Sequence, residues 1–170
     1  MRTVRFQLLI DEGVLQSGDG YRAKMKELNG TGYPFLRGEC VLDRYIVVKE
    51  NERFHESLSP KLESKLSRAG DTVVTTKGNS TGRAAYVRDD LPTFVYSPHL
   101  SFWRSLDHEK LHPGFLREWA HAPEFTGQLN GMKDSTDMAP YLRSWALDLT
   151  RIFPNNVPFS GPMPPARLSI

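Results

Sequence analysis

Two kinds of hydrophobic spacing divide the chain into a strand-rich middle and a helical part that follows it. Residues 72–76 and 83–87 are short β-rich runs bounded by turn-forming residues. Residues 94–103 form a third strand candidate, in which Pro98 must lie at an edge or a bulge because proline has no backbone N–H to donate. These three segments predict a sheet in the middle of the chain.

Before this sheet the pattern is less regular. The apolar residues of segment 4–16 predict a short helix followed by a strand, and the two glycines of segment 17–20 predict a turn. Further extended pieces are expected at residues 34–37, 41–42 and 45–48. The first fifty residues therefore predict several short elements joined by polar loops.

Helical spacing is found in one segment before the sheet and in three segments after it. Residues 58–66 predict a helix that Ser59 caps, with Pro60 in its first turn. The later helices are expected at residues 113–120, at residues 123–132 and from 135–137 onward, the last with Leu149 on its inner face. The aromatic residues of these helices are predicted to fill the core.

With 170 residues, the chain is long enough for one domain with its own core, which we expect to cover residues 1–153. Residues 152–153 offer a last short strand. Residues 154–170 hold five of the twelve prolines, and no acidic residue follows Asp148. This composition predicts a proline-rich, disordered tail.

Composition narrows the class of protein further. No apolar run approaches the roughly 18–20 residues of a membrane span, so no membrane association is expected. The single cysteine, Cys40, excludes an internal disulfide and a cysteine-based zinc cluster. A net charge of +2 is uninformative by itself. We expect a soluble cytoplasmic protein.

The distribution of charge says more than its sum. Segment 21–37 contains Arg22, Lys24, Lys26 and Arg37 against Glu27 alone, and segment 72–88 contains three Lys or Arg residues and no carboxylate. Cationic segments separated from acidic ones can build a positive face. Ordinary solvated cations explain the same pattern, and charge alone leaves both interpretations open.

Residues 75–83 form a polar loop between two predicted strands. The loop carries two cations, two glycines and five hydroxyl or amide side chains, which are the types that contact phosphates and base edges. Three residues separate its glycines, Arg83 follows them, and a strand comes next. A nucleotide-binding P-loop needs a longer spacing, a lysine and a following helix, so the loop indicates recognition rather than nucleotide hydrolysis.

Other catalytic patterns are weak. His108 and His112 have helical spacing, but Pro113 follows and no third metal ligand is well spaced, so no metal site is expected. Ser97, with a histidine and an aspartate nearby, lacks the turn motif of a catalytic serine. Glu63 precedes a lysine by two residues, but both lie in a predicted helix rather than in a nuclease-type strand pair. The chain is therefore expected to be non-catalytic.

Four segments resemble one known family. They are GDGYRAK at 18–24, GYPFLR at 32–37, GDTVVTTKGNSTGR at 70–83 and FVYSPHL at 94–100. In this order and spacing they resemble the target recognition domain of the specificity (S) subunit of type I restriction-modification systems. The resemblance covers about residues 6–142.

The resemblance implies an α+β fold, with a mixed or antiparallel sheet and several packed helices in a single half-size domain. It implies a non-catalytic module that reads one half of a bipartite site in double-stranded DNA. Such a subunit directs a modification subunit, which methylates adenine with S-adenosylmethionine, and an ATP-dependent restriction subunit. It implies no cofactor, metal or small-molecule substrate for the chain itself.

The predicted DNA contacts come from two loops that match the family by position, 22–26 and 77–83, and from the basic residue that ends the second matching segment. They are Arg22, Lys24, Lys26, Arg37, Lys77, Asn79, Ser80, Thr81 and Arg83. Lys77 and Arg83 suit phosphate or guanine, and Asn79 suits adenine. In the alternative interpretation the glycines only shape a turn, and residues 96–99 are scaffold.

The sequence departs from the family in having one recognition domain and no long helix after residue 142. A truncated copy or a fragment is therefore expected. The competing function is a protein-interaction remnant or decoy, which binds modification or restriction subunits without useful DNA affinity. An aromatic face formed by Trp103, Trp119 and Trp145 would favour it.

Overall fold

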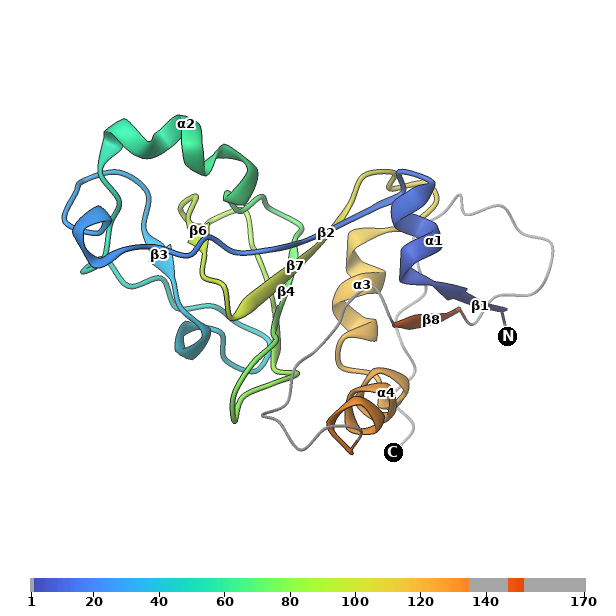
Figure 1. Ribbon diagram of the computed structural model, residues 1–170. Helices are drawn as coiled ribbons and strands as arrows, with labels where there is room; N and C mark the ends of the chain where they lie inside the picture. Colours follow the sequence, from blue (N-terminus) through green and yellow to red (C-terminus); the bar gives the residue numbers. More distant parts are fainter. Residues whose placement is uncertain (1, 135–146, 152–170) are drawn as a thin grey trace.

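A computed structural model describes residues 2–134 and 147–151. Its centre is a four-stranded antiparallel sheet with the strand order β2-β7-β4-β5. These strands are β2 (Leu15–Asp19), β7 (Leu100–Ser105), β4 (Thr72–Thr75) and β5 (Ala84–Tyr86). Helices α1, α3 and α4 lie on one side of the central strands, and α2, β3 and β6 lie on the other side (Figure 1).

Both faces of this sheet are covered, so its two inner strands are buried along their whole length. In β4, Val74 packs into the helical side and Val73 into the opposite side. In β7, Trp103 packs into the helical side and Phe102 into the opposite side. Alternate side chains of a strand point to opposite faces, which explains why every residue of β4 and β7 is buried.

The helical side contains α1 (Phe6–Asp11), α3 (Pro113–Trp119), α4 (Pro123–Asp134) and the antiparallel pair β1 (Arg2–Arg5) and β8 (Asp148–Arg151). Its core is aromatic. The ring of Trp103 lies 5.1 Å from that of Phe6, 5.9 Å from that of Trp119 and 5.6 Å from that of Phe125, measured between centroids. Trp103 and Trp119 are both buried, so neither contributes to an exposed aromatic face.

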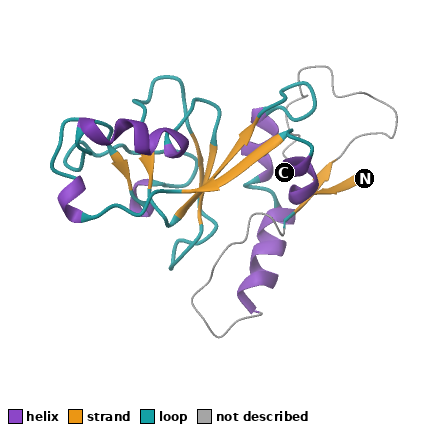
Figure 2. Ribbon diagram, turned by 45° about the horizontal axis from the view of Figure 1, so that its top comes forward, coloured by secondary structure: helices purple, strands orange, loops and turns teal. Residues whose placement is uncertain are grey.

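The opposite side is built from short elements (Figure 2). Strands β3 (Phe35–Leu36) and β6 (Val95–Tyr96) pair in parallel, and α2 spans Ser59–Leu62. Single 3₁₀ turns cover Met25–Glu27, Gly38–Cys40, Glu56–Leu58 and Glu63–Lys65. Loop segments thus make up much of this side, and they are held against the sheet by buried apolar side chains such as Phe54 and Leu62.

A buried ion pair joins the sheet to this loop-rich side. Both oxygens of the Asp71 carboxylate, which is 0% exposed, accept hydrogen bonds at 2.7 Å from Nε and Nη2 of Arg104. The same carboxylate accepts bonds from the Tyr96 hydroxyl at 2.7 Å and from the Arg68 backbone N–H at 2.9 Å. Burial raises the pKa of Tyr96 well above its usual value, so its hydroxyl remains a donor at neutral pH.

The α+β class and the antiparallel central sheet confirm the fold expected from the sequence. The short helix and strand expected within residues 4–16 are present as α1 and β2, although β2 runs three residues further. The strands at 72–76 and 83–87 and the helices at 113–120 and 123–132 are confirmed within one or two residues. The domain limits, 1–153 and 154–170, stay predictions. The proline-rich tail, the strand at 152–153 and the start of a helix at 135–137 lie outside the described residues.

Four local predictions are wrong. Residues 17–19 continue β2 instead of turning, because they pair with β7. Segment 94–103 is two strands, β6 and β7, separated by a turn that holds Pro98. Segment 58–66 splits into α2 and 3₁₀ turns, and Ser59 makes no capping bond. Leu149 lies in β8, where pairing with β1 replaces the expected helix.

Candidate nucleic-acid interface

The loop between β4 and β5 is a closed, hydrogen-bonded turn. The Gly82 backbone N–H donates to Thr75 O at 2.8 Å, and the Thr75 N–H donates to Arg83 O at 2.9 Å. The Thr75 hydroxyl donates to Ser80 O and accepts from the Arg83 N–H at 3.0 Å. These bonds hold the loop backbone in one shape, while the side chains of Lys77, Asn79 and Arg83 remain exposed.

Two glycines give the loop its left-handed corners. The φ angles of Gly78 and Gly82 are 81° and 92°, a region that residues with a side chain adopt at a cost. Gly82 also lies against α4, where an added Cβ would come 2.0 Å from Leu129 Cδ2. An added Cβ at Gly78 would meet nothing within 4 Å. Gly82 therefore has a packing role that Gly78 does not have.

We expect Gly82→Ala to destabilise the protein more than Gly78→Ala. Strained φ should cost about 1–2 kcal/mol at either site, and overpacking against Leu129 should add about 1–3 kcal/mol at residue 82 alone. Urea unfolding of both variants measures the difference. Equal losses in the two variants would contradict a packing role for Gly82, and Gly82→Ala combined with Leu129→Ala should cost less than the two single changes added together.

The segment that carries Arg22, Lys24 and Lys26 is held against β6. The Tyr21 backbone N–H donates to Tyr96 O at 2.7 Å. A Cβ at Gly20 would lie 2.0 Å from the backbone oxygen of Ser97, so only glycine permits this approach. The segment then ends in the 3₁₀ turn Met25–Glu27. The contact with β6 brings this segment beside the 97–99 turn.

The two predicted loops line one hollow of about 640 Å³. Six of the nine predicted contact residues line it: Arg22, Arg37, Lys77, Asn79, Ser80 and Arg83. Lys24 and Lys26 are exposed but do not line it. Thr81 is 7% exposed, and its hydroxyl donates to Gly78 O at 2.6 Å, so this side chain shapes the loop.

Arg37 is the most firmly positioned cation of the hollow. Its Nε and Nη2 donate to the two Glu52 carboxylate oxygens at 2.5 and 2.8 Å, and its guanidinium lies 5.2 Å from the Phe35 ring centre. These hydrogen bonds from Arg37 lower the pKa of Glu52 below its usual value. The guanidinium edge formed by Nη1 and the second Nη2 proton is not used by Glu52 and can still donate.

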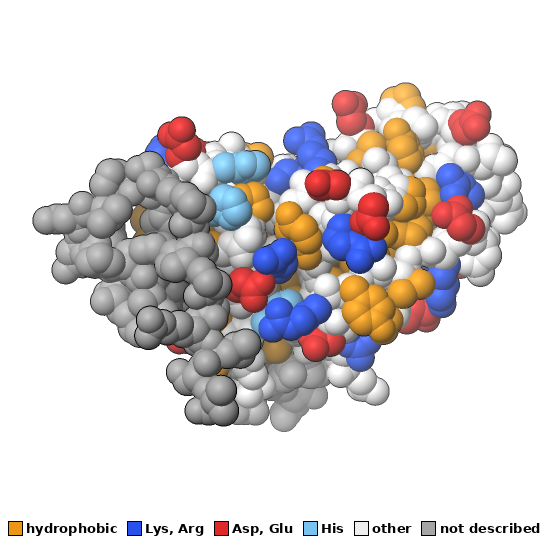
Figure 3. Space-filling model, turned by 180° about the vertical axis from the view of Figure 1, so that it is seen from behind, with side chains coloured by type: hydrophobic (Ala, Val, Ile, Leu, Met, Phe, Trp, Pro, Cys, Tyr) orange, Lys and Arg blue, Asp and Glu red, His pale blue; other side chains and the backbone are white. Residues whose placement is uncertain are grey.

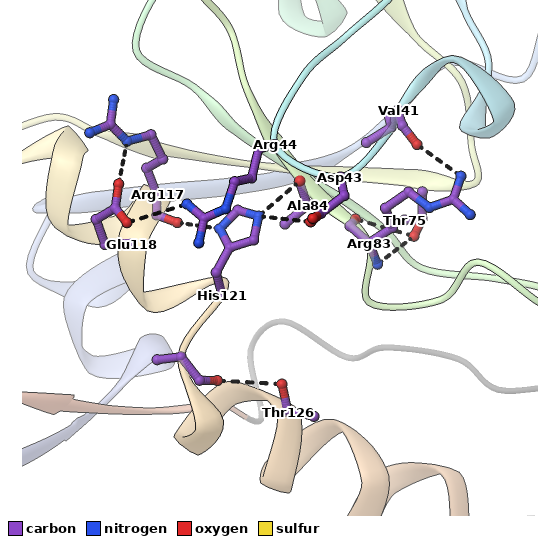
Figure 4. Close-up of polar contacts among 11 residues, drawn as sticks. Val41, Asp43, Arg44, Thr75, Arg83, Ala84, Arg117, Glu118, His121 and Thr126 are labelled. Carbon is purple, nitrogen blue, oxygen red and sulfur yellow. Dashed lines mark hydrogen bonds and ion pairs between the residues drawn. The ribbon is translucent and has the colours of Figure 1, made fainter. Parts of the chain in front are cut away.

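Arg83 is fixed less tightly, and the strand that follows it is supported by His121, which lies just after α3 (Figure 4). Its Nη1 donates to Val41 O at 3.3 Å. The next residue, Ala84, has its backbone oxygen 3.1 Å from Nε2 of His121 and accepts the Arg44 N–H at 2.9 Å. The Arg83 end of the β4–β5 loop is thus held by the sheet and by the segment that follows α3.

Sequence reasoning missed three exposed side chains that line the hollow: Met25, Glu39 and His99. His99 lies inside the family-like segment 94–100, for which a scaffold role is the alternative interpretation. Met25 is 74% exposed between two lysines, and Glu39 follows Arg37 by two residues. Proximity to predicted contacts is the available signal in all three cases.

Among the described residues, no group of three or more His, Cys, Asp or Glu side chains is placed to hold a metal ion. Nor does the described part of the chain contain a helix long and apolar enough to cross a membrane. On the face shown in Figure 3, Lys and Arg side chains lie beside Asp and Glu side chains rather than in one positive area. The polar side chains that line the hollow are cations, an amide, hydroxyls, a histidine and one carboxylate.

Two solved structures have a similar fold. One is a chain of a type I R-M system, described for its complex assembly and conformational transition, with a TM-score of 0.55, 16% identity, and coverage of 87% of this chain and 33% of that chain. The other is the type I restriction-modification S subunit from M. genitalium, with a TM-score of 0.54, 12% identity, and coverage of 86% of this chain and 33% of that chain.

At these identities the likeness is one of fold, and at that level the resemblance seen in the sequence is confirmed. The chain spans about a third of the length of these solved chains. No family model matches the sequence, and neither does any curated protein. The chain therefore has a fold similar to that of part of a type I restriction-modification S subunit.

Proposed function

We propose that this chain is a non-catalytic DNA recognition module of a type I restriction-modification specificity subunit, and that its hollow contacts double-stranded DNA. The observation that carries the proposal is the meeting of two loops that are distant in the sequence. Segments 22–37 and 77–83 each stand out in the sequence for their cationic or amide side chains, and both line the same hollow.

The side chains of the hollow divide naturally between phosphate and base contacts. Arg22 and Lys77 are exposed cations on loops, the type that neutralises phosphates. Asn79 suits a bidentate contact with adenine, and Arg37 or Arg83 suits guanine.

In this proposal the module reads one half of a bipartite site and directs a modification subunit and a restriction subunit to it. Adenine methylation and DNA cleavage then belong to those partner subunits. The solved chains of similar fold are more than twice as long as this one, as a subunit with two modules and connecting helices would be. We assign the chain to the cytoplasm, where the DNA is.

Selection from random duplexes tests the proposal. Purified chain, alone and with a modification subunit added, is equilibrated with duplexes that contain a random segment, and the bound fraction is sequenced. The expected result is an enriched motif of about three to five base pairs, each pair contributing about 1–3 kcal/mol of discrimination. No enriched motif under either condition would overturn the proposed function.

The feature that would favour the decoy alternative is not present among the described residues. That feature is an aromatic face formed by three tryptophans. Trp103 is 0% exposed and Trp119 is 4% exposed, and both pack in the helical core. Trp145 lies outside the described residues. No observation among the described residues favours the decoy over DNA recognition.

A further inference from the structure

Among the described residues that line the hollow, Glu39 is the single carboxylate. The other charged residues that line it are Arg22, Arg37, Lys77 and Arg83. An exposed carboxylate beside a surface that binds DNA has an energetic consequence, because it repels every phosphate that approaches it. The groups that DNA can present to it favourably are the hydrogen-bond donors on base edges.

The backbone under Glu39 is rigid. It lies in the 3₁₀ turn Gly38–Cys40, where the Cys40 N–H donates to Arg37 O at 3.0 Å and the Val41 N–H donates to Gly38 O at 3.2 Å. Cys40 is 2% exposed and belongs to the core beneath the turn. The side chain of Glu39 therefore projects from a fixed point at the edge of the hollow.

The carboxylate is ionised and keeps an acceptor for DNA. Lys49 Nζ donates to Glu39 Oε1 at 2.5 Å, and this bond lowers the pKa of Glu39. Lys49 does not line the hollow, so the lysine holds the carboxylate from outside. The Oε2 atom, and the second lone pair of Oε1, remain available to accept hydrogen bonds.

The major-groove edges of the four bases differ in what they offer this acceptor. Guanine and thymine present acceptors there, so a carboxylate is repelled by them. The amino group of adenine lies between two acceptors, its own N7 and O4 of the paired thymine, whereas the N4 amino group of cytosine has an acceptor on one side only, O6 of the paired guanine. We infer that Glu39 is a specificity-determining residue, which selects cytosine by accepting a hydrogen bond from the N4 amino group of that base. This inference rests on the proposed contact between the hollow and DNA.

The test compares Glu39→Gln with Lys49→Met in the full chain. Glutamine keeps the size of the side chain but exchanges an acceptor for a donor, and suits adenine. Lys49→Met removes the ion pair but keeps the carboxylate. Both variants and the unmodified chain are selected on random duplexes at one salt concentration, and binding is then titrated on duplexes that differ at one base pair.

The unmodified chain should prefer cytosine at one position of its motif by roughly tenfold. Glu39→Gln should lose this preference and gain adenine at that position alone, and Lys49→Met should retain cytosine. An unchanged motif in Glu39→Gln would overturn the inference while leaving the proposed function intact. Equal loss in both variants would also overturn it, because the ion pair would then be the cause. If the unmodified chain enriches no motif, the inference on Glu39 and the proposed function are both overturned.

Discussion

Replacing Asp71 by alanine is expected to lower the free energy of unfolding by about 3–5 kcal/mol, the typical cost of removing one partner of a buried ion pair. The reason is the charge left behind. The side chain of Arg104 is 9% exposed, and two of its nitrogens donate to the Asp71 carboxylate. Without that carboxylate the guanidinium must stay buried uncompensated, and the Tyr96 hydroxyl loses its acceptor.

Urea unfolding followed by circular dichroism measures this loss, and Asp90→Ala is the matched control. Asp90 also forms a two-bond contact with an arginine, Arg88, but the two side chains are 68% and 61% exposed. An exposed pair of this kind contributes about 0–1 kcal/mol. If both variants lost the same small free energy of unfolding, burial would not make the Asp71–Arg104 pair more stabilising than an exposed pair. Asp71→Leu combined with Arg104→Met should cost less than the two single changes added together.

The sequence predicts strands β4 and β5 well because nearly all of their residues are buried. Segments 72–76 and 83–87 are rich in residues that favour strands, and covering both faces requires no polar alternation. Two of the failed local predictions, at residues 17–19 and at Leu149, have a common cause. At residues 17–19 the glycine favours a turn, but pairing with β7 outweighs this local preference. Tertiary pairing of this kind cannot be read from a single segment.

Part of the candidate site can likewise be predicted from local sequence, and part depends on contacts between distant segments. The polar character of the β4–β5 loop and of segment 22–26 can be read from residue types, and both loops are therefore candidate contacts on sequence alone. Their meeting depends on the approach of Gly20 to the backbone of Ser97, and on the β3–β6 pairing that places Arg37. Both are interactions between distant segments. The burial of Thr81 and the exposure of His99 likewise depend on how the loops fold.

Substituting both Lys77 and Arg83 by alanine is expected to weaken DNA binding by roughly tenfold for each cation removed, as for hydrogen bonds to charged groups. The salt dependence separates the two kinds of interaction that these cations can make. Each phosphate that a cation neutralises contributes about −0.9 to the slope of log affinity against log salt. If both cations bind phosphates, the slope of the double variant should be shallower by about 1.8. If one of them binds guanine instead, its removal should relax the motif at one position.

The control for this experiment removes the same charge elsewhere. Arg88→Ala combined with Lys110→Ala deletes two exposed cations that do not line the hollow, and so lowers the net charge equally. Titrations of both double variants at several salt concentrations then distinguish a specific interface from general attraction to DNA. Affinity should fall far more for the Lys77 and Arg83 variant, because its cations lie where the two loops meet. Equal losses in the two double variants would mean that net charge, and not the hollow, governs binding.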